Sequence, residues 1–208
     1  DSSGSVSGKP QVPMVKSGTL TAVEERLEFL KREAEIYGEG FLGTGIIICY
    51  MKQLCDLAEL RSFYNLYIKD ENINKKNSKG LTMINSAVFF NSYPIIDFLL
   101  NITDININGD DAGDNPLLFS IYMIVTETEN FDGIEMVRFL LNKKLNGEYM
   151  FDVNIEDSDG HTPLENACCV YKNKDLVTEL IKRASDADIT NCKMKLMEEV
   201  RNITHIQK

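Results

Sequence analysis

Side chains that commonly carry chemistry are sparse in this sequence of 208 residues. Histidine occurs only at His161 and His205, so a nucleophile activated by imidazole would need one of these two beside it. His161 lies in a segment typical of a turn, and His205 lies near the last residue given. We therefore expect no catalytic histidine.

The cysteines have neither the paired spacing of a zinc site nor the density of a disulfide scaffold. There are five of them, an odd number: Cys49, Cys55, Cys168, Cys169 and Cys192. Reduced thiols are typical of cytoplasmic or nuclear proteins. Glycosylation triplets at Asn101 and Asn202 point the other way, but such triplets arise by chance and no segment resembles a signal peptide.

Two further motifs have the spacing of a ligand-binding site, but the residues around them do not fit such a site. Gly38, Gly40 and Gly43 match a dinucleotide-binding spacing, but that motif must follow a strand, and a helical pattern precedes these glycines.

The second motif, Asp157 and Asp159 ahead of Gly160, is similar to a calcium loop. Its register, however, puts Ile155 at the first ligand position and Asn166 at the bidentate position. We expect no catalytic residue, no cofactor and no metal ion, and so no enzyme.

The charge of the chain restricts its partners. A formal net charge of -10 repels nucleic acids and anionic membranes. Lys75, Lys76 and Lys79 form the only dense basic cluster, which is typical of a solvated turn. The longest apolar stretch, 41–50, is interrupted by glycines and is shorter than the roughly 18 residues of a membrane helix. We expect neither nucleic acid, membrane nor a small-molecule substrate as partner.

Residues 1–19 lack hydrophobic periodicity and predict a flexible tail, whereas residues 20–45 predict a helix followed by a glycine-rich loop. Thr21 and Glu24 have the spacing of a capping box. The apolar face of this helix comprises Val23, Leu27, Leu30 and Ala34. We expect the helix to end near Tyr37–Gly38.

Three later segments repeat a common pattern, in which a glycine precedes a short apolar helix and then a second one. Gly80 and Gly113 lie 33 residues apart. Gly160 begins the clearest copy, Asp-Gly-His-Thr-Pro-Leu over residues 159–164. Asn74 and Asn154 each stand six residues ahead of the glycine of their copy, in Asn-Ile-Asn and Asp-Val-Asn triplets.

The pattern resembles the ankyrin-repeat family over roughly residues 46–191. The match at 159–164 is specific, while Met83 and Leu118 depart from the family's proline and histidine. The resemblance implies an all-α solenoid of about four stacked helix pairs, joined by β-hairpin-like loops. A capping helix over residues 192–208, with a stripe of Met194, Met197, Val200 and Ile203, would close the stack.

Each motif position in the clearest copy has a physical reason. Thr162 can cap the first helix, Pro163 occupies a position where a missing N–H costs nothing, and Gly160 permits a tight turn. Leu164 and Ala167 are expected in the shared core.

In ankyrin-like folds the varied positions of the first helix meet the partner. Carried over by position, the predicted binding residues are Ser86, Phe89, Phe90, Phe119, Tyr122, Met123, Asn166, Cys169 and Val170. A surface made of these largely apolar residues would suit the binding of an apolar helix or an extended peptide. The alternative is that these side chains belong to the core, because a register error of one residue would turn Phe89 or Phe119 inward.

The turn tips are acidic and predict a basic partner, or else an ordinary solvated set of turns. The acidic residues are Asp110, Asp111, Glu156, Asp157 and Asp159. The third copy also carries extra residues around 127–133 and 146–151, which are either recognition loops or tolerated drift.

We expect a non-catalytic protein-interaction module, such as an adaptor, scaffold, inhibitor or pathogen effector. Two alternatives remain: a substrate-docking part of an enzyme with its chemistry elsewhere, and a structural subunit of a larger assembly.

Overall fold

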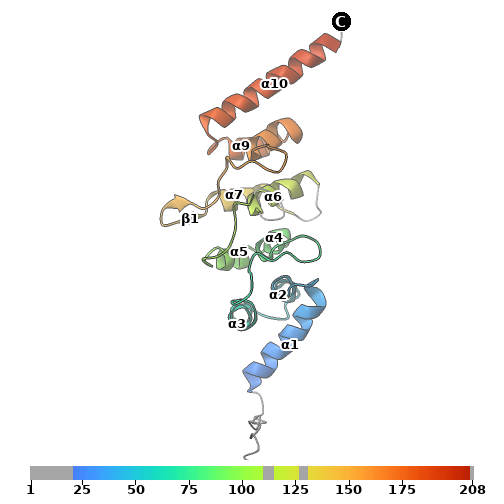
Figure 1. Cartoon of the computed structure of the whole chain (residues 1–208), viewed down its shortest axis with the longest axis vertical. Coiled ribbons are helices and arrows are strands. Elements are labelled where there is room, and N and C mark those ends of the chain that lie inside the picture. Colours follow the sequence, from blue (N-terminus) through green and yellow to red (C-terminus); the bar gives the residue numbers. More distant parts are fainter. Residues whose placement is uncertain (1–20, 110–114, 127–130, 207–208) are drawn as a thin grey trace, which may run out of the picture.

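The computed structural model is mostly helical and describes residues 21–109, 115–126 and 131–206. The predicted tail at 1–19 and the tip residues Asp110 and Asp111 lie outside these ranges. Helix α1 (Ala22–Tyr37) lies near one end of the molecule, and α10 (Asp186–Ile206) lies at the other (Figure 1).

Between these two helices, pairs of short helices follow one another along the long axis (Figure 1). Within each pair the helices contact each other, and the first helices of consecutive pairs also touch in order. The pairs are α2 (Leu42–Met51) with α3 (Leu57–Tyr67), α4 (Met83–Phe89) with α5 (Tyr93–Leu99), α6 (Pro116–Val125) with α7 (Gly133–Leu141), and α8 (Pro163–Glu165), continued by η1 (Asn166–Val170), with α9 (Lys174–Leu180).

Local signals set several helix starts as predicted. Thr21 and Glu24 form a capping box at the start of α1. Thr162 and Glu165 form another at α8, with Pro163 in the first turn. Side-chain oxygens at these positions satisfy N–H groups that have no partner inside the helix.

The apolar face of α1 is shorter than predicted. Leu27, Leu30 and Ala34 are buried, as the spacing indicated, whereas Val23 is 67% exposed. Only the later turns of the helix are covered, because α2 and α3 pack against them and leave the first turn in solvent.

The glycine-rich segment after α1 is not the loop that we predicted, since α2 already begins at Leu42. A Cβ atom at Gly45 would lie 1.9 Å from the carbonyl oxygen of Ala34 in α1. At Gly43 it would lie 2.7 Å from the Phe41 ring. Gly45 therefore allows α1 and α2 to approach closely, and Gly43 leaves room for the Phe41 ring.

Two turns that precede first helices share one geometry. In the first, the backbone N–H of Asn77 donates to the Leu81 carbonyl, and that of Gly80 donates to Asn77. The side-chain oxygen of Asn77 accepts from the N–H groups of Lys79 and Leu81 at 2.9 and 3.0 Å. Gly80 has a φ of 77°, a conformation that glycine adopts without strain.

The second turn repeats these contacts one by one. Asp157 takes the place of Asn77 and accepts from the N–H groups of Asp159 and His161 at 3.0 and 2.9 Å. Gly160 has a φ of 76°. Gly113, the third glycine of the pattern, lies outside the described ranges.

Asparagine side chains join each turn segment to the next. The side-chain amide of Asn74 donates to the carbonyl of Asp104 at 2.8 Å, and its oxygen accepts from the N–H of Asn106 at 2.7 Å. One asparagine thus satisfies two backbone groups of the following segment.

The same contacts recur further along the chain. Asn108 donates to the carbonyl of Met150 at 3.0 Å and accepts from the N–H of Asp152 at 3.1 Å. Asn154 then accepts from the N–H of Ser185, directly ahead of α10, at 2.9 Å. We call these three asparagines the asparagine rungs.

One of the two insertions in the third copy forms a small hairpin. Strand β1 (Lys144–Leu145) pairs antiparallel with β2 (Glu148–Tyr149), and these two strands make the only sheet within the described residues. Asn146 and Gly147 have φ values of 52° and 90°, as a tight hairpin turn requires. Part of the other insertion, 127–130, is not described.

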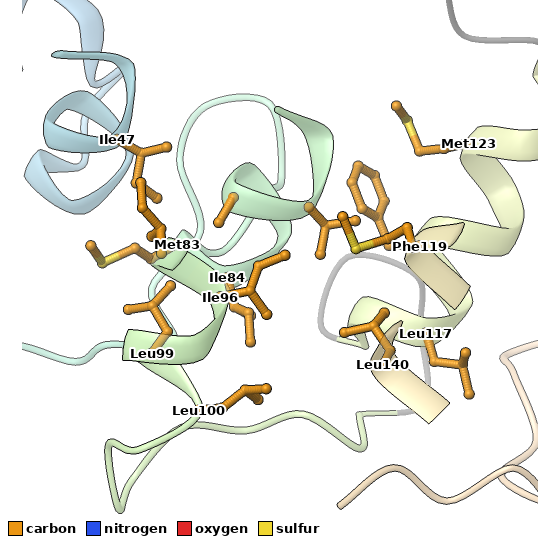
Figure 2. Close-up of a cluster of buried hydrophobic side chains, with 14 of the residues drawn as sticks. Ile47, Met83, Ile84, Ile96, Leu99, Leu100, Leu117, Phe119, Met123 and Leu140 are labelled. Carbon is orange, nitrogen blue, oxygen red and sulfur yellow. The ribbon is translucent and has the colours of Figure 1, made fainter. Parts of the chain in front are cut away.

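The buried core runs from α1 to the first turns of α10. Leu164 and Ala167 lie in it as predicted, at 1% and 0% exposure. Figure 2 shows its central part, where Ile84 and Met83 of α4, Leu99 of α5 and Leu140 of α7 lie in one cluster of apolar side chains.

The last helix differs from its prediction. It starts at Asp186 rather than near 192, so the segment 187–191 is its first part and not the tail of a repeat. Met194 and Met197 are 64% and 57% exposed, so they do not close the stack of helices. Only the beginning of α10 packs on the body, because the helix then leaves it obliquely (Figure 1).

Candidate partner-binding surface

The residues predicted to bind a partner divide into an exposed set and a buried set. In α4, Phe89 is 42% exposed and Phe90 is half-buried, with their rings edge to face at 5.0 Å. Ser86 of the same helix is buried, and its hydroxyl donates to the Thr82 carbonyl at 2.9 Å. Ser86 is therefore a structural residue of the unbound chain.

In α6 a single residue of the predicted three is exposed. Tyr122 is 50% exposed, whereas Phe119 and Met123 are 5% and 4% exposed. Figure 2 shows Phe119 and Met123 beside the central cluster of buried side chains. These two side chains belong to the core in this structure, because buried residues lie on more than one side of α6.

In the last unit Val170 is 50% exposed, Cys169 is half-buried and Asn166 is buried. Asn166 donates its side-chain amide to Asp157 at 2.6 Å and so holds the preceding turn. Like Ser86, Asn166 is buried and its side chain makes a hydrogen bond inside the fold.

What remains is one exposed apolar or aromatic residue in each of three first helices, α4, α6 and α8 with η1. We call Phe89, Tyr122 and Val170 the exposed row. Phe89 and Tyr122 lie 33 residues apart in the sequence, the same spacing as Gly80 and Gly113. Since α4, α6 and α8 touch in order, the row passes from one pair of helices to the next.

Tyr171 extends the row and was not predicted. Burial raises the pKa of its phenol, and the charges of Asp157 and Asp159 and the nearby Tyr122 raise it further. The side chain therefore lies near Tyr122 of the preceding unit and near the acidic turn.

A change in helix type explains why the sequence comparison missed Tyr171. The N–H of Tyr171 donates to the carbonyl of Asn166 at 2.8 Å, a bond that spans five residues and makes η1 a π-helical turn. A π-helical turn holds more residues than an α-helical one. Positions carried over from the other copies consequently slip in this helix.

The three predicted acidic residues of the last turn have different roles. Asp159 is exposed, whereas Asp157 is half-buried. Burial acts to raise the pKa of Asp157, but hydrogen bonds from Asn166, His161 and Asp159 outweigh it and lower the pKa. Asp157 is thus an ionised turn former, and Glu156 and Asp159 are the exposed acidic groups beside it.

The corresponding turn of the second unit is basic. Lys75, Lys76 and Lys79 are all exposed there, and Lys79 pairs with Glu39 at 2.6 Å. The basic turn precedes α4 and the acidic turn precedes α8, so the two ends of the exposed row lie in opposite electrostatic surroundings.

A cavity of about 890 Å³ lies between the last unit and α10. It is open, and its lining includes Glu156, Thr162, Glu165, Lys195 and Met197. No group of three or more His, Cys, Asp or Glu side chains is placed to hold a metal ion in the parts of the chain that the structure describes. Across the same residues, no helix is long and apolar enough to span a membrane.

Comparisons with protein-family models, with curated proteins and with solved structures found no match to this chain.

Proposed function

We propose that the chain is a short ankyrin-type solenoid. Three observations support this fold: the specific sequence match at 159–164, the equivalent turns that contain Gly80 and Gly160, and the asparagine rungs between consecutive segments. One helix pair buries too little apolar surface to fold alone, so contacts between neighbouring units supply the stability.

The proposed activity is non-catalytic binding of another protein, as in an adaptor, scaffold, inhibitor or pathogen effector. The observation that carries this proposal is the exposed row, where Phe89, Tyr122 and Val170 stay in solvent while the residues directly beside them are buried or half-buried. Aromatic side chains are enriched at the centres of protein interfaces, because they bury a large area with little loss of conformational freedom.

The chemistry of the surface defines the partner. An apolar helix or extended segment would cover the row, and basic side chains of that segment would lie toward Tyr171, beside Glu156 and Asp159. Exposed charge pairs contribute modestly to affinity, so we assign affinity to the row and orientation to the charges.

The test compares two triple variants in affinity capture from the cells of origin. The first variant replaces the row (Phe89→Ser, Tyr122→Ser, Val170→Ser). The second replaces equally exposed apolar residues elsewhere (Leu66→Ser, Leu145→Ser, Ile181→Ser), which are 58%, 53% and 42% exposed. Circular dichroism checks that both variants are folded.

We expect the wild-type chain and the second variant to retain the same captured protein and the row variant to lose it. Equal retention by both variants would reject the row as the binding surface. A chain that is insoluble without a co-expressed subunit would instead support the structural-subunit alternative, and turnover of a substrate by the isolated chain would support the enzyme alternative.

A cytoplasmic or nuclear location belongs to the same proposal. All five cysteines are free thiols, and free thiols persist in reducing compartments.

A further inference from the structure

Three thiols from two separate elements meet where α10 joins the body. Cys168 and Cys169 are adjacent in η1 and half-buried, and Cys192 of α10 is 3% exposed. Helix α10 contacts η1, and the Cys168 and Cys169 thiols lie close enough to Cys192 to change its pKa. Its sulfur also lies 3.9 Å from the carbonyl oxygen of Leu164.

The position of Cys192 on α10 matters mechanically. Asp188 and Cys192 are buried against the last unit, whereas every side chain from Lys193 to Glu198 is exposed. Cys192 is thus the last buried side chain of α10 in the described part of the helix. A covalent bond there would hold the helix at the point where it leaves the body.

Two polar contacts fix the same junction. The hydroxyl of Thr162 donates to Asp188 at 2.6 Å, and Lys195 pairs with Glu165 at 2.8 Å. Both contacts connect α10 to the start of α8, so the junction has a defined geometry. These contacts keep the start of α10 against the last unit, where Cys168 and Cys169 lie.

The π-helical turn is the second notable feature of this junction. Such turns are rare and often occur at functional sites. Here it carries the two adjacent cysteines and contacts α10 directly. A metal site is not supported, because no set of three such ligands in the described residues has suitable geometry.

We propose that Cys168 and Cys192 form a reversible disulfide, with a low-molecular-weight disulfide such as oxidised glutathione as the oxidant. The half-buried thiol of Cys168 loses its proton and attacks the glutathione disulfide, which gives a mixed disulfide and releases one reduced glutathione. The thiol of Cys192 then loses its proton and attacks the Cys168 sulfur, releasing a second reduced glutathione. Two protein thiols are oxidised by two electrons, and one glutathione disulfide is reduced.

The surroundings make this reaction slow at neutral pH. Burial raises the pKa of the Cys168 thiol and raises that of Cys192 to about 12. Asp188 acts in the same direction at both thiols, and Glu165 does so at Cys168. Lys195 is the cation near Cys192 and Cys169. Since the thiolate is the attacking species, we expect the disulfide to form only under sustained oxidation.

The test treats the full reduced chain with glutathione disulfide at about pH 8, where more thiolate is present. Remaining thiols are alkylated, and peptides are mapped without reduction by tandem mass spectrometry, which separates Cys168 from Cys169. The internal control is the pair Cys49 and Cys55, which is buried near α1 with pKa values of about 11 and 12. Hydrogen exchange of α10 is measured before and after oxidation.

We expect a Cys168–Cys192 linked peptide as the main product and no link between Cys49 and Cys55. Amide protection in the first half of α10 should rise at least about tenfold, since the bond closes a loop at the helix base. Dithiothreitol should reverse both effects. A Cys192→Ala variant should stop at a glutathione adduct on Cys168, and Cys168→Ala should leave Cys192 reduced.

Three results would overturn the proposal. One is a Cys169–Cys192 link as the main product, which would remove Cys168 from the reaction. Another is that Cys192 is still fully alkylated after the more exposed thiols have reacted with glutathione disulfide, which would show that Cys192 stayed reduced. The third is a random mixture of links among the five cysteines, which would show that oxidation follows unfolding. A folded Cys168→Ala variant, checked by circular dichroism, keeps the test valid even if Cys192→Ala unfolds.

Discussion

Asn108 reaches from its own turn segment to the next and donates its side-chain amide to the carbonyl oxygen of Met150 at 3.0 Å. The same side chain accepts from the N–H of Asp152. One side chain therefore joins two consecutive segments through one donated and one accepted hydrogen bond. The third copy contains the β1–β2 insertion directly before Met150. Asn108 nevertheless makes the same kind of contacts to the next segment as Asn74 does.

Loss of this rung should destabilise the chain. Asn108→Ala removes two hydrogen bonds between segments, so we expect the free energy of unfolding to fall by about 1–2 kcal/mol, as measured by urea denaturation. Asn101→Ala is the matched control, because Asn101 bonds only to the Asp97 carbonyl of its own helix end, at 2.7 Å. Equal losses in the two variants would contradict a specific role for the rung.

Phe119 and Tyr122 should behave differently although they lie one helical turn apart in α6. Phe119→Ala leaves a cavity in the core, and we expect a loss of about 3–5 kcal/mol. Tyr122→Ala removes a half-exposed ring and should change stability by roughly 0.5 kcal/mol or less. Thermal and urea unfolding of the two single variants check this. A large loss at Tyr122 would mean that the exposed row is part of the core.

Two glycine substitutions should differ through the space around them. At Gly45 a Cβ would meet the Ala34 carbonyl at 1.9 Å, so Gly45→Ala must push α1 and α2 apart and should cost about 3 kcal/mol or more. At Gly160 nothing lies within 4 Å, and Gly160→Ala should cost only about 1 kcal/mol from its positive φ. Unfolding curves that rank the two variants in the opposite order would refute the close helix crossing.

Glu179 should make stability depend on pH in the acid range. Hydrogen bonds from Arg138 of α7, at 2.9 Å, and from Lys182 lower its pKa from 4.5 to about 2. The folded state therefore favours the ionised carboxylate. Its contribution is complete above about pH 5 and is lost as the pH falls toward 2.

The size of this contribution is limited by solvent, because the Arg138 side chain is 41% exposed. We expect Glu179→Gln to cost about 1 kcal/mol at neutral pH. The difference from wild type should shrink steadily between pH 5 and pH 2 in unfolding measurements. A constant difference across that range would show that the loss comes from packing and not from charge.

Local sequence signals determined several of the turns and helix starts of this protein. Thr21, Thr162 and Gly160 have the roles predicted from their neighbours alone, because a cap or a tight turn depends on a few adjacent backbone groups. The asparagines of the Asn-Ile-Asn and Asp-Val-Asn triplets were visible as a pattern. Their partners in the next segment were not, because no sequence signal marks a carbonyl 30 residues away.

Only the tertiary structure decided which apolar side chains face solvent. Phe119 and Tyr122 are both aromatic residues in one short, strongly apolar helix, and their fates depend on which side the neighbouring helix pairs cover. The same holds for Gly45, which lies in a segment predicted as a loop but stands at the crossing of α1 and α2. It also holds for Cys192, which is buried where α10 contacts η1. Whether a side chain is buried depends on which neighbouring element packs against it. In a chain built from similar units, the sequence of one unit does not specify which of its faces the neighbouring units cover.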